Sequence, residues 1–235
     1  MRSTLLSACI TSFFIFNNAF AQEGLFQGEV ELGWMSTSGN TDTESMNSTI
    51  SLDYRGSAWR HALTLSALRS KDLGETIANQ RNALWRSTYY FGRQYFLFGD
   101  LLYEKDDFAG YQQRQTEVFG LGRDLVDSES FTFDVEAGLG ARQTEQSDMS
   151  NNDEGIIRLG VRLIWPISEN SAFKQDINTE LGDDSTVTRS ITSLRVNVNS
   201  RLAMKMSYKS IYNNRVPIGK EKRDSYVVAS LIFGF

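Results

Sequence analysis

A single antiparallel β-barrel of about twelve strands that crosses a membrane is the fold class that the sequence predicts, and three observations predict it. From Gln22 onward, about a dozen segments alternate apolar and polar side chains with a period of two, which a strand keeps on separate faces and a helix would mix. The connections alternate between short turns and longer polar loops, as in transmembrane barrels. The sequence also ends on an apolar stretch, Asp224 to Phe235, without a polar tail.

Residues 1–21 are predicted to be a cleaved signal peptide, which leaves residues 22–235 as one outer-membrane β-barrel domain. The segment has a positive start, a mostly apolar run from Leu5 to Phe16 and a small-x-small site at Ala19-Phe20-Ala21. A single anchoring helix is the alternative, but Asn17-Asn18 ends the apolar run short of the roughly 20 residues that span a bilayer. We therefore expect an exported protein.

Composition excludes some classes of protein and is compatible with a barrel. Hydrophobic residues make up 40% of the chain, which suits strands that show lipid only at every second position. The net charge of −5 argues against nucleic-acid binding, which needs a concentrated basic surface. Cys9 is the only cysteine. Its acylation is an alternative that we set aside, because only two apolar residues precede its cleavage box.

Segment by segment, the alternation varies in clarity. It is strictest from Phe131 to Arg142, whereas Gln113 to Leu125 has no clean register because Phe119 and Leu121 share a side with charged residues. The closing strand is expected to pair with the first, Glu29 to Met35. Longer polar loops are expected near 36–43, 70–77, 106–112, 145–153, 182–186 and 213–223.

Four stretches carry a resemblance to a known family. They are G-N-T-D-T-E from Gly39, W-R-H-A-L-T-L-S from Trp59, the run Tyr95 to Tyr111, and the final L-I-F-G-F. Together they resemble the YdiY-like family, described as salt-induced outer-membrane proteins of unknown function. The likeness covers essentially the whole chain after the signal peptide. It implies an outer-membrane β-barrel of a Gram-negative bacterium and brings no catalytic residues with it.

The predicted inward face is densely charged, which a dry apolar core would not tolerate unless the charges are hydrated or paired. The candidate lumen charges are Arg142, Arg158, Arg162, Arg189, Arg195, Lys205, Lys209, Asp134 and Glu136. Two interpretations follow. Neighbouring charges of opposite sign could form a plug of salt bridges. Alternatively, the eighth, tenth and eleventh strands, which offer only cations, could form a basic wall that favours anionic solutes.

Aromatic residues are expected to narrow the lumen. Phe96 and Phe98 point inward on the fifth strand, near inward-pointing glycines at positions 120, 122, 138, 140 and 160. Glycines that face rings leave room for the rings to fill the interior. The sequence therefore predicts a constricted channel with Phe96 and Phe98 at its narrowest level, and not an open porin.

The end of the sequence resembles the closing strand of bacterial outer-membrane barrels. Phe233 and Phe235 share its lipid face, and we interpret Phe235 as part of the signal that the barrel assembly machinery reads. Deleting Phe235 should impair insertion more than transport. The other expected partners are outer-membrane lipid and lipopolysaccharide, and the sequence does not indicate an oligomeric state.

No cofactor, metal site or catalytic residue is predicted. The acidic pairs Asp106-Asp107, Asp153-Glu154 and Asp183-Asp184 lack the spacing of a calcium loop, and we expect them to be solvated loop charges. His61 is the only histidine, and a hydrolase using it with Ser66 or Ser87 is a distant alternative. The predicted function is a narrow channel for small anionic solutes, with a non-conducting, salt-bridged stress-response barrel as the main rival.

Overall fold

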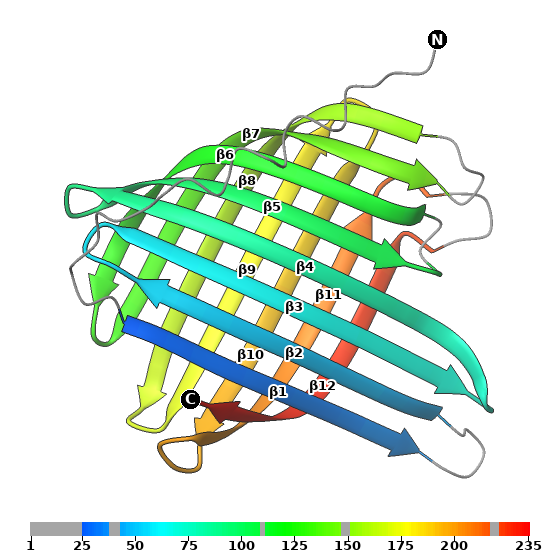
Figure 1. Ribbon diagram of the computed structural model, residues 1–235, viewed down its shortest axis with the longest axis horizontal. Helices are drawn as coiled ribbons and strands as arrows, with labels where there is room; N and C mark the ends of the chain where they lie inside the picture. The colour runs from blue at the N-terminus through cyan, green and yellow to red at the C-terminus, as the bar shows by residue number, and fades with distance from the viewer. Residues whose placement is uncertain (1–24, 38–42, 109–110, 147–150, 217–220) are drawn as a thin grey trace, which may run out of the picture.

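The computed structural model describes residues 25–37, 43–108, 111–146, 151–216 and 221–235, and these form a closed barrel of twelve antiparallel strands (Figure 1). Each strand pairs with the next along the chain, and β12 pairs with β1. This confirms the predicted fold class. The strands are β1 (Leu25–Thr37), β2 (Thr43–Arg55), β3 (Trp59–Asp72), β4 (Glu75–Phe91), β5 (Tyr95–Asp106), β6 (Tyr111–Ser128), β7 (Phe131–Gln146), β8 (Asn151–Ser168), β9 (Ser171–Gly182), β10 (Thr186–Asn197), β11 (Leu202–Asn213) and β12 (Arg223–Gly234).

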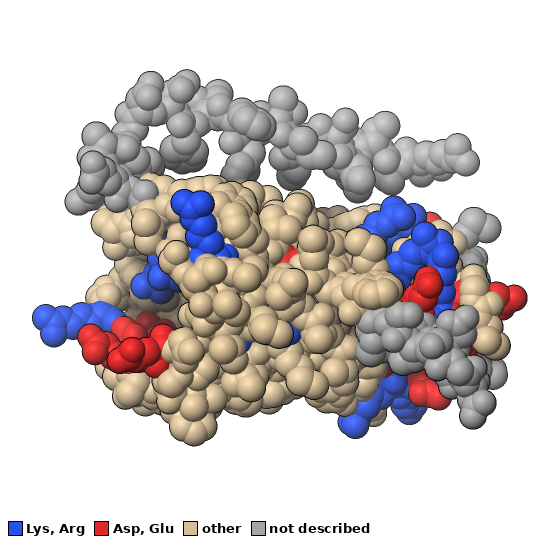
Figure 2. Space-filling view, turned by 90° about the horizontal axis from the view of Figure 1, so that it is seen from below, with Lys and Arg blue, Asp and Glu red and all other residues tan. Residues whose placement is uncertain are grey.

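The burial pattern is the reverse of that in a water-soluble protein. Phe119 is 64% exposed and Leu139 is 69% exposed, whereas the side chains of Arg142 and Glu180 are fully buried. Period-two alternation produces this pattern, because lipid-facing and lumen-facing residues alternate along every strand of a membrane barrel. Figure 2 shows the same arrangement from outside, with charged side chains gathered at the two ends and few in the middle of the face. Over the described residues there is no helix long and apolar enough to cross a membrane.

The structure defines the register of β6, which was ambiguous in the sequence. Phe119 and Leu121 face outward together with Glu117 and Arg123. Arg123 lies over the ring of Tyr95 at 5.1 Å from its centroid, beside a short turn, and Glu117 accepts a hydrogen bond of 2.8 Å from Gln115. The apolar band on β6 is therefore narrow, with polar side chains on its outer face at both ends.

The hairpin between β3 and β4 corrects the loop expected at residues 70–77. β3 continues to Asp72 and β4 begins at Glu75, so the turn consists of Leu73 and Gly74, both with positive φ (50° and 85°). Such a two-residue turn matches the twist of a hairpin. Polar residues on both faces of these strands look like a loop in the sequence, although they continue the ladder beyond the apolar band.

The ring closes through β1 and β12 over a short stretch. The paired positions run from Glu29 with Gly234 to Gly33 with Ser230, and Gly28 and Phe235 exchange two backbone hydrogen bonds of 2.9 Å. The Phe235 ring covers Gly28, where a Cβ would overlap it. The expected pairing of the last strand with the first is therefore present, but it ends at Gly33 and does not reach Met35.

Inside the barrel, Phe96 and Phe98 form an apolar cluster with Val118 and Ile156, and their own exposures are 3% and 1%. The two ring centroids are 6.5 Å apart. A Cβ on Gly122 would overlap the Phe96 ring, so this glycine is required for the ring to lie against β6.

Replacing Gly122 with alanine should therefore destabilise the barrel, because its methyl group would enter a packed cluster. We expect the free energy of unfolding to fall by about 1–3 kcal/mol, measured by urea titration of protein folded in detergent micelles. Gly99→Ala is the matched control, since among the described residues no atom lies within 4 Å of the position that its Cβ would take. Equal losses in the two variants would contradict the packing role of Gly122.

Candidate functional site: an arginine–carboxylate network in the lumen

Nine charged side chains from six strands form one connected set of ion pairs inside the barrel, which we call the lumen network. Its members are Arg86 (β4), Asp100 and Glu104 (β5), Glu136 and Arg142 (β7), Glu154 and Arg158 (β8), Glu180 (β9) and Arg189 (β10). Each belongs to the inward set of its strand because of the alternation. The network holds four arginines and five carboxylates, so its charges nearly cancel.

Glu180 is the node of the lumen network. Its carboxylate contacts three guanidinium groups, those of Arg142 at 3.1 Å, Arg189 at 3.0 Å and Arg158 at 3.6 Å, and its side chain is fully buried. A carboxylate removed from water in this way needs nearby positive charge, because the cost of its desolvation must be offset by ion pairing. The other network carboxylates then balance the arginines that surround Glu180.

Some of these ion pairs cross the lumen. Arg189 on β10 lies 2.6 Å from Glu104 on β5, five strands away around a ring of twelve. Arg158 on β8 reaches Asp100 on β5 at 2.6 Å. Arg86 on β4 pairs with Glu136 on β7. Side chains therefore bridge the interior at this level, beside the Phe96 and Phe98 cluster.

Charged side chains in the lumen are more exposed toward the end that holds the short turns. There Arg162 pairs with Asp176 at 2.8 Å, and Arg195 pairs with Glu29 at 2.7 Å. The side chains of both arginines are about one-third exposed, at 33% and 36%. Lys205 pairs with Glu31 nearby. These ion pairs are therefore less buried than those of the lumen network.

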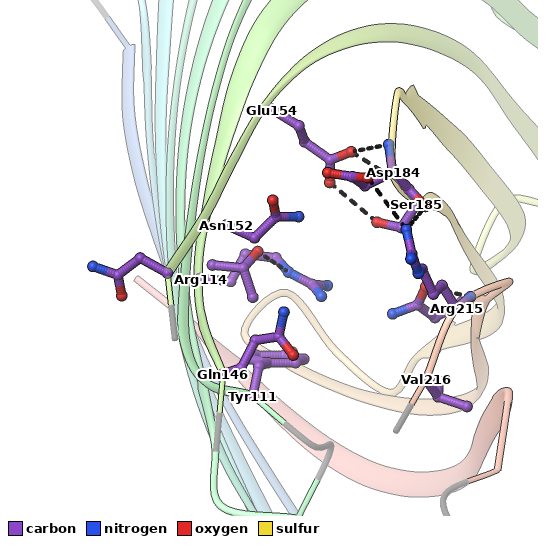
Figure 3. A pocket seen from close by; sticks show the side chains of 12 residues that line it. Tyr111, Arg114, Gln146, Asn152, Glu154, Asp184, Ser185, Arg215 and Val216 are labelled. Atoms are coloured by element: carbon purple, nitrogen blue, oxygen red, sulfur yellow. Dashed lines mark hydrogen bonds and ion pairs between the residues drawn. The ribbon is translucent and has the colours of Figure 1, made fainter. Parts of the chain in front are cut away.

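At the end that holds the longer loops, a cavity of about 420 Å³ opens above the lumen network (Figure 3). Arg114 lies in its wall with 5% exposure, donates a hydrogen bond from Nε to Thr144 at 3.3 Å and stacks on Tyr111 at 4.1 Å from the ring centroid. Within the described parts of the chain, no carboxylate lies at ion-pair distance from this guanidinium. It is a buried cation that faces the cavity.

Glu154 connects this cavity to the lumen network. It accepts hydrogen bonds from the backbone N–H groups of Asp184 (3.0 Å) and Ser185 (3.2 Å) and pairs with Arg142 at 2.6 Å (Figure 3). The expectation that Asp153-Glu154 is a solvated loop pair is wrong for Glu154, which is 8% exposed within β8. Asp106 is likewise buried at the end of β5.

The wall formed by β2 and β3 differs from the rest of the lumen. Thr49 and Ser51 on β2 pair in register with Ser66 and Thr64 on β3, and all four inward side chains are partly exposed. None of them belongs to the lumen network. The interior therefore has a packed, ion-paired part carried by β4 to β10 and a wall of small hydroxyl side chains on β2 and β3.

The structure brings most of the predicted lumen charges into ion pairs. Arg142, Arg158, Arg162, Arg189, Arg195 and Lys205 each contact a carboxylate, and Glu136 contacts Arg86. Asp134 is buried opposite Arg162 in the register of β7 and β8. Lys209 lies on the inward face of β11, opposite Ile191 on β10 and Tyr226 on β12, and is not a member of the lumen network. Sequence reasoning missed Arg114, although it lies an even number of residues from the inward-facing Gly120 and therefore shares the lumen face of its strand.

His61 lies on the outer face between two aromatic rings. Its centroid is 5.7 Å from that of Trp59 and 6.2 Å from that of Tyr54. Ser87 occupies the opposite register position on β4, whereas Ser66 is on the lumen face. Among the described residues, no hydrogen bond joins His61 to either serine, and no cluster of three or more potential metal ligands is present.

Closure, inverted burial and a charged interior together define an outer-membrane-type β-barrel with a porin-like fold. The solved structure of the NanC porin shares this fold, with a TM-score of 0.56 and 11% sequence identity over 88% of this chain and 98% of that one. The profile of the family "Protein of unknown function, DUF481" matches residues 30–235, so the chain belongs to that family. The uncharacterized protein YdiY of Escherichia coli K12 is 23% identical over 192 residues, which are 82% of this chain and 76% of YdiY.

Replacing Glu180 with glutamine should be strongly destabilising, since it leaves buried arginines without their shared carboxylate. Removing one partner of a buried ion pair costs about 3–5 kcal/mol, and we expect a loss of that order in urea titrations. The control is Asp184→Asn, which breaks the exposed pair with Arg215 and should cost less than about 1 kcal/mol. A similar small loss for both variants would show that Glu180 is not the node of the network.

Proposed function

We propose that the chain is a narrow outer-membrane channel for small solutes and that the lumen network forms its constriction. The observation that carries this proposal is the asymmetry of the interior. The network and the Phe96 and Phe98 cluster occupy the part carried by β4 to β10, whereas the inward hydroxyl side chains of β2 and β3 are partly exposed. Solutes would pass along that hydroxyl-lined wall, which offers hydrogen bonds without strong charge.

In this proposal, the preference for anions comes from the mouth of the barrel and not from a basic wall along the lumen. Arg158, Arg189 and Arg195 each contact a carboxylate, so their charge is largely neutralised. Arg114 has no such partner in the described part of the chain and faces the outer cavity. A mild preference for anions would follow from this buried cation.

A second candidate is a barrel that does not conduct and has a structural or stress-response role. The complete burial of the Arg142 and Glu180 side chains favours it. The two candidates share one fold and one set of ion pairs, and they differ in whether water forms a continuous path along β2 and β3. We do not propose the hydrolase, because the described residues include no contact between His61 and a serine nucleophile.

The remaining parts of the proposal concern location and assembly. The porin-like fold and the similarity to YdiY support the outer membrane as the location. Residues 1–21, which lie outside the described residues, would direct export. Phe233 and Phe235 would be read by the barrel assembly machinery, and surface charges at the outer rim would contact lipopolysaccharide. No nucleic-acid partner is proposed.

A tryptophan at Ser66 should obstruct the proposed path. Purified wild-type protein in planar lipid bilayers should show discrete conductance, and Ser66→Trp should reduce it by about half or more, because the indole would fill the polar wall. Leu65→Trp is the matched control, since Leu65 faces outward and is already 42% exposed. Silence of the wild type in several salts would refute the channel and favour the sealed barrel.

Replacing Arg114 with glutamine should shift ion selectivity toward cations. The change removes a buried cation at the outer cavity, so the reversal potential in a potassium chloride gradient should move in the cation-selective direction. Lys105→Gln removes the same charge from the outer surface and should leave the reversal potential unchanged. If both variants behave like the wild type, Arg114 does not set selectivity.

A further inference from the structure

The seam between β1 and β12 is open over part of its length. In the described chain, register pairs between these strands end at Gly33 with Ser230. The same register would add four more pairs, from Trp34 with Ala229 to Thr37 with Tyr226. Instead, β1 remains paired with β2 as far as Thr37, and β12 remains paired with β11 as far as Arg223. Figure 1 shows β12 turning away from β1 toward the end with the longer loops.

Gly33 is the residue at which the two strands separate. A Cβ there would lie 2.8 Å from the backbone oxygen of Ala229 and 3.0 Å from Val228 Cγ1, so β12 passes very close to β1 at this point. Just below it, Glu31 accepts a hydrogen bond from Ser230 at 2.7 Å and pairs with Lys205. The closed part of the seam is thus fastened by side chains, and the strands diverge immediately beyond this fastening.

A cavity of about 460 Å³ occupies the open part of the seam. Outward-facing side chains line it, among them Trp34 (69% exposed), Ile77 (50%) and Val227 (54%). Inward-facing side chains line it as well, among them Asn47 and Ala78. Because residues of both faces border one cavity, it reaches from the outer surface into the barrel wall at the seam.

Asn47 gives this opening a polar point of attachment. The residue is 4% exposed, and its Nδ2 atom has no hydrogen-bond partner among the described residues. A buried donor left without an acceptor costs about 1–3 kcal/mol. An acceptor entering the cavity, such as an ester or phosphate oxygen, would remove that cost.

The position of the opening favours one class of occupant. Tryptophans of membrane barrels concentrate at the level of the lipid head groups, and Trp34 lies at the mouth of the cavity on the outer face. Backbone groups that lack ladder partners are also poorly tolerated next to hydrocarbon. An amphiphile whose polar head reaches Asn47 would solvate these groups, while its acyl chains would lie along Trp34, Ile77 and Val227.

We propose that the seam between β1 and β12 is a lateral binding site for a membrane lipid, which inserts its head group into the barrel wall, where a lipid oxygen accepts a hydrogen bond from Asn47 Nδ2. A strand from another copy of the chain would pair with the exposed edges but would leave Asn47 without an acceptor. A lipid would supply an acceptor for Asn47 and would also cover the exposed strand edges. The inference is independent of conduction along the barrel axis, since the cavity lies in the barrel wall.

Cysteine cross-linking tests the opening itself. Ser36→Cys with Val227→Cys joins the third register position beyond Gly33, whereas Leu32→Cys with Leu231→Cys joins a pair that the structure shows in register. A disulfide needs Cα atoms within about 7 Å. In phosphatidylethanolamine–phosphatidylglycerol vesicles under mild oxidation, we expect the control pair to cross-link at least about tenfold faster. Equal rates would show a closed seam and overturn the proposal.

Lipid retention tests the occupant. Native mass spectrometry in detergent, with added phosphatidylethanolamine, should show the wild type retaining one lipid and Asn47→Leu losing at least about fivefold in occupancy, a loss of roughly 1 kcal/mol. Asn82→Leu is the matched control, because Asn82 is also an inward carboxamide but does not line the cavity. Equal lipid retention by all three proteins, or dimers joined at the seam in place of bound lipid, would overturn the proposal. A silent bilayer recording would leave both tests unaffected.

Discussion

The rule that every backbone polar group must find a partner within lipid governs the rest of this structure. It forces the strands into a ring, since only a closed ladder lacks edges, and it turns the apolar face of each strand outward. The charged residues of a chain with net charge −5 are then directed into a small interior. Burial of Arg142 and Glu180 is thus a consequence of closing the ring, and the lumen network is the arrangement that makes this burial tolerable.

Ion pairing of this kind contributes more to defining the interior than to stabilising it. Desolvating two charges costs several kcal/mol for each ion, and their attraction only offsets this when the geometry is good. Glu180 achieves such geometry by facing three arginines from three different strands. Displacing any one of these strands would break ion pairs with several others, so the network holds β4 to β10 in one relative arrangement.

Alternation along the sequence was sufficient to predict the fold and the direction of most side chains, because it depends on local geometry alone. It placed Phe96, Phe98 and Arg158 inside. The partners of the charges were harder to predict. Arg189 meets Glu104 across five strands, a contact that depends on the tilt and stagger of the closed ring and leaves no trace in neighbouring residues. The turn at Leu73 and Gly74 was missed because strands beyond the apolar band are polar on both faces.

The same dependence on global geometry explains where the seam opens. β1 and β12 are the strands whose pairing is not fixed by a hairpin, so only side chains and backbone bonds between distant parts of the chain hold them together. Glu31, with Ser230 and Lys205, provides such a contact below Gly33, and in the described chain the register pairs of the two strands end at Gly33. The lumen network ties strands on the far side of the ring. Mobility of the wall would therefore concentrate at the seam, where a lipid head group can enter without disturbing the ion pairs that fill the lumen.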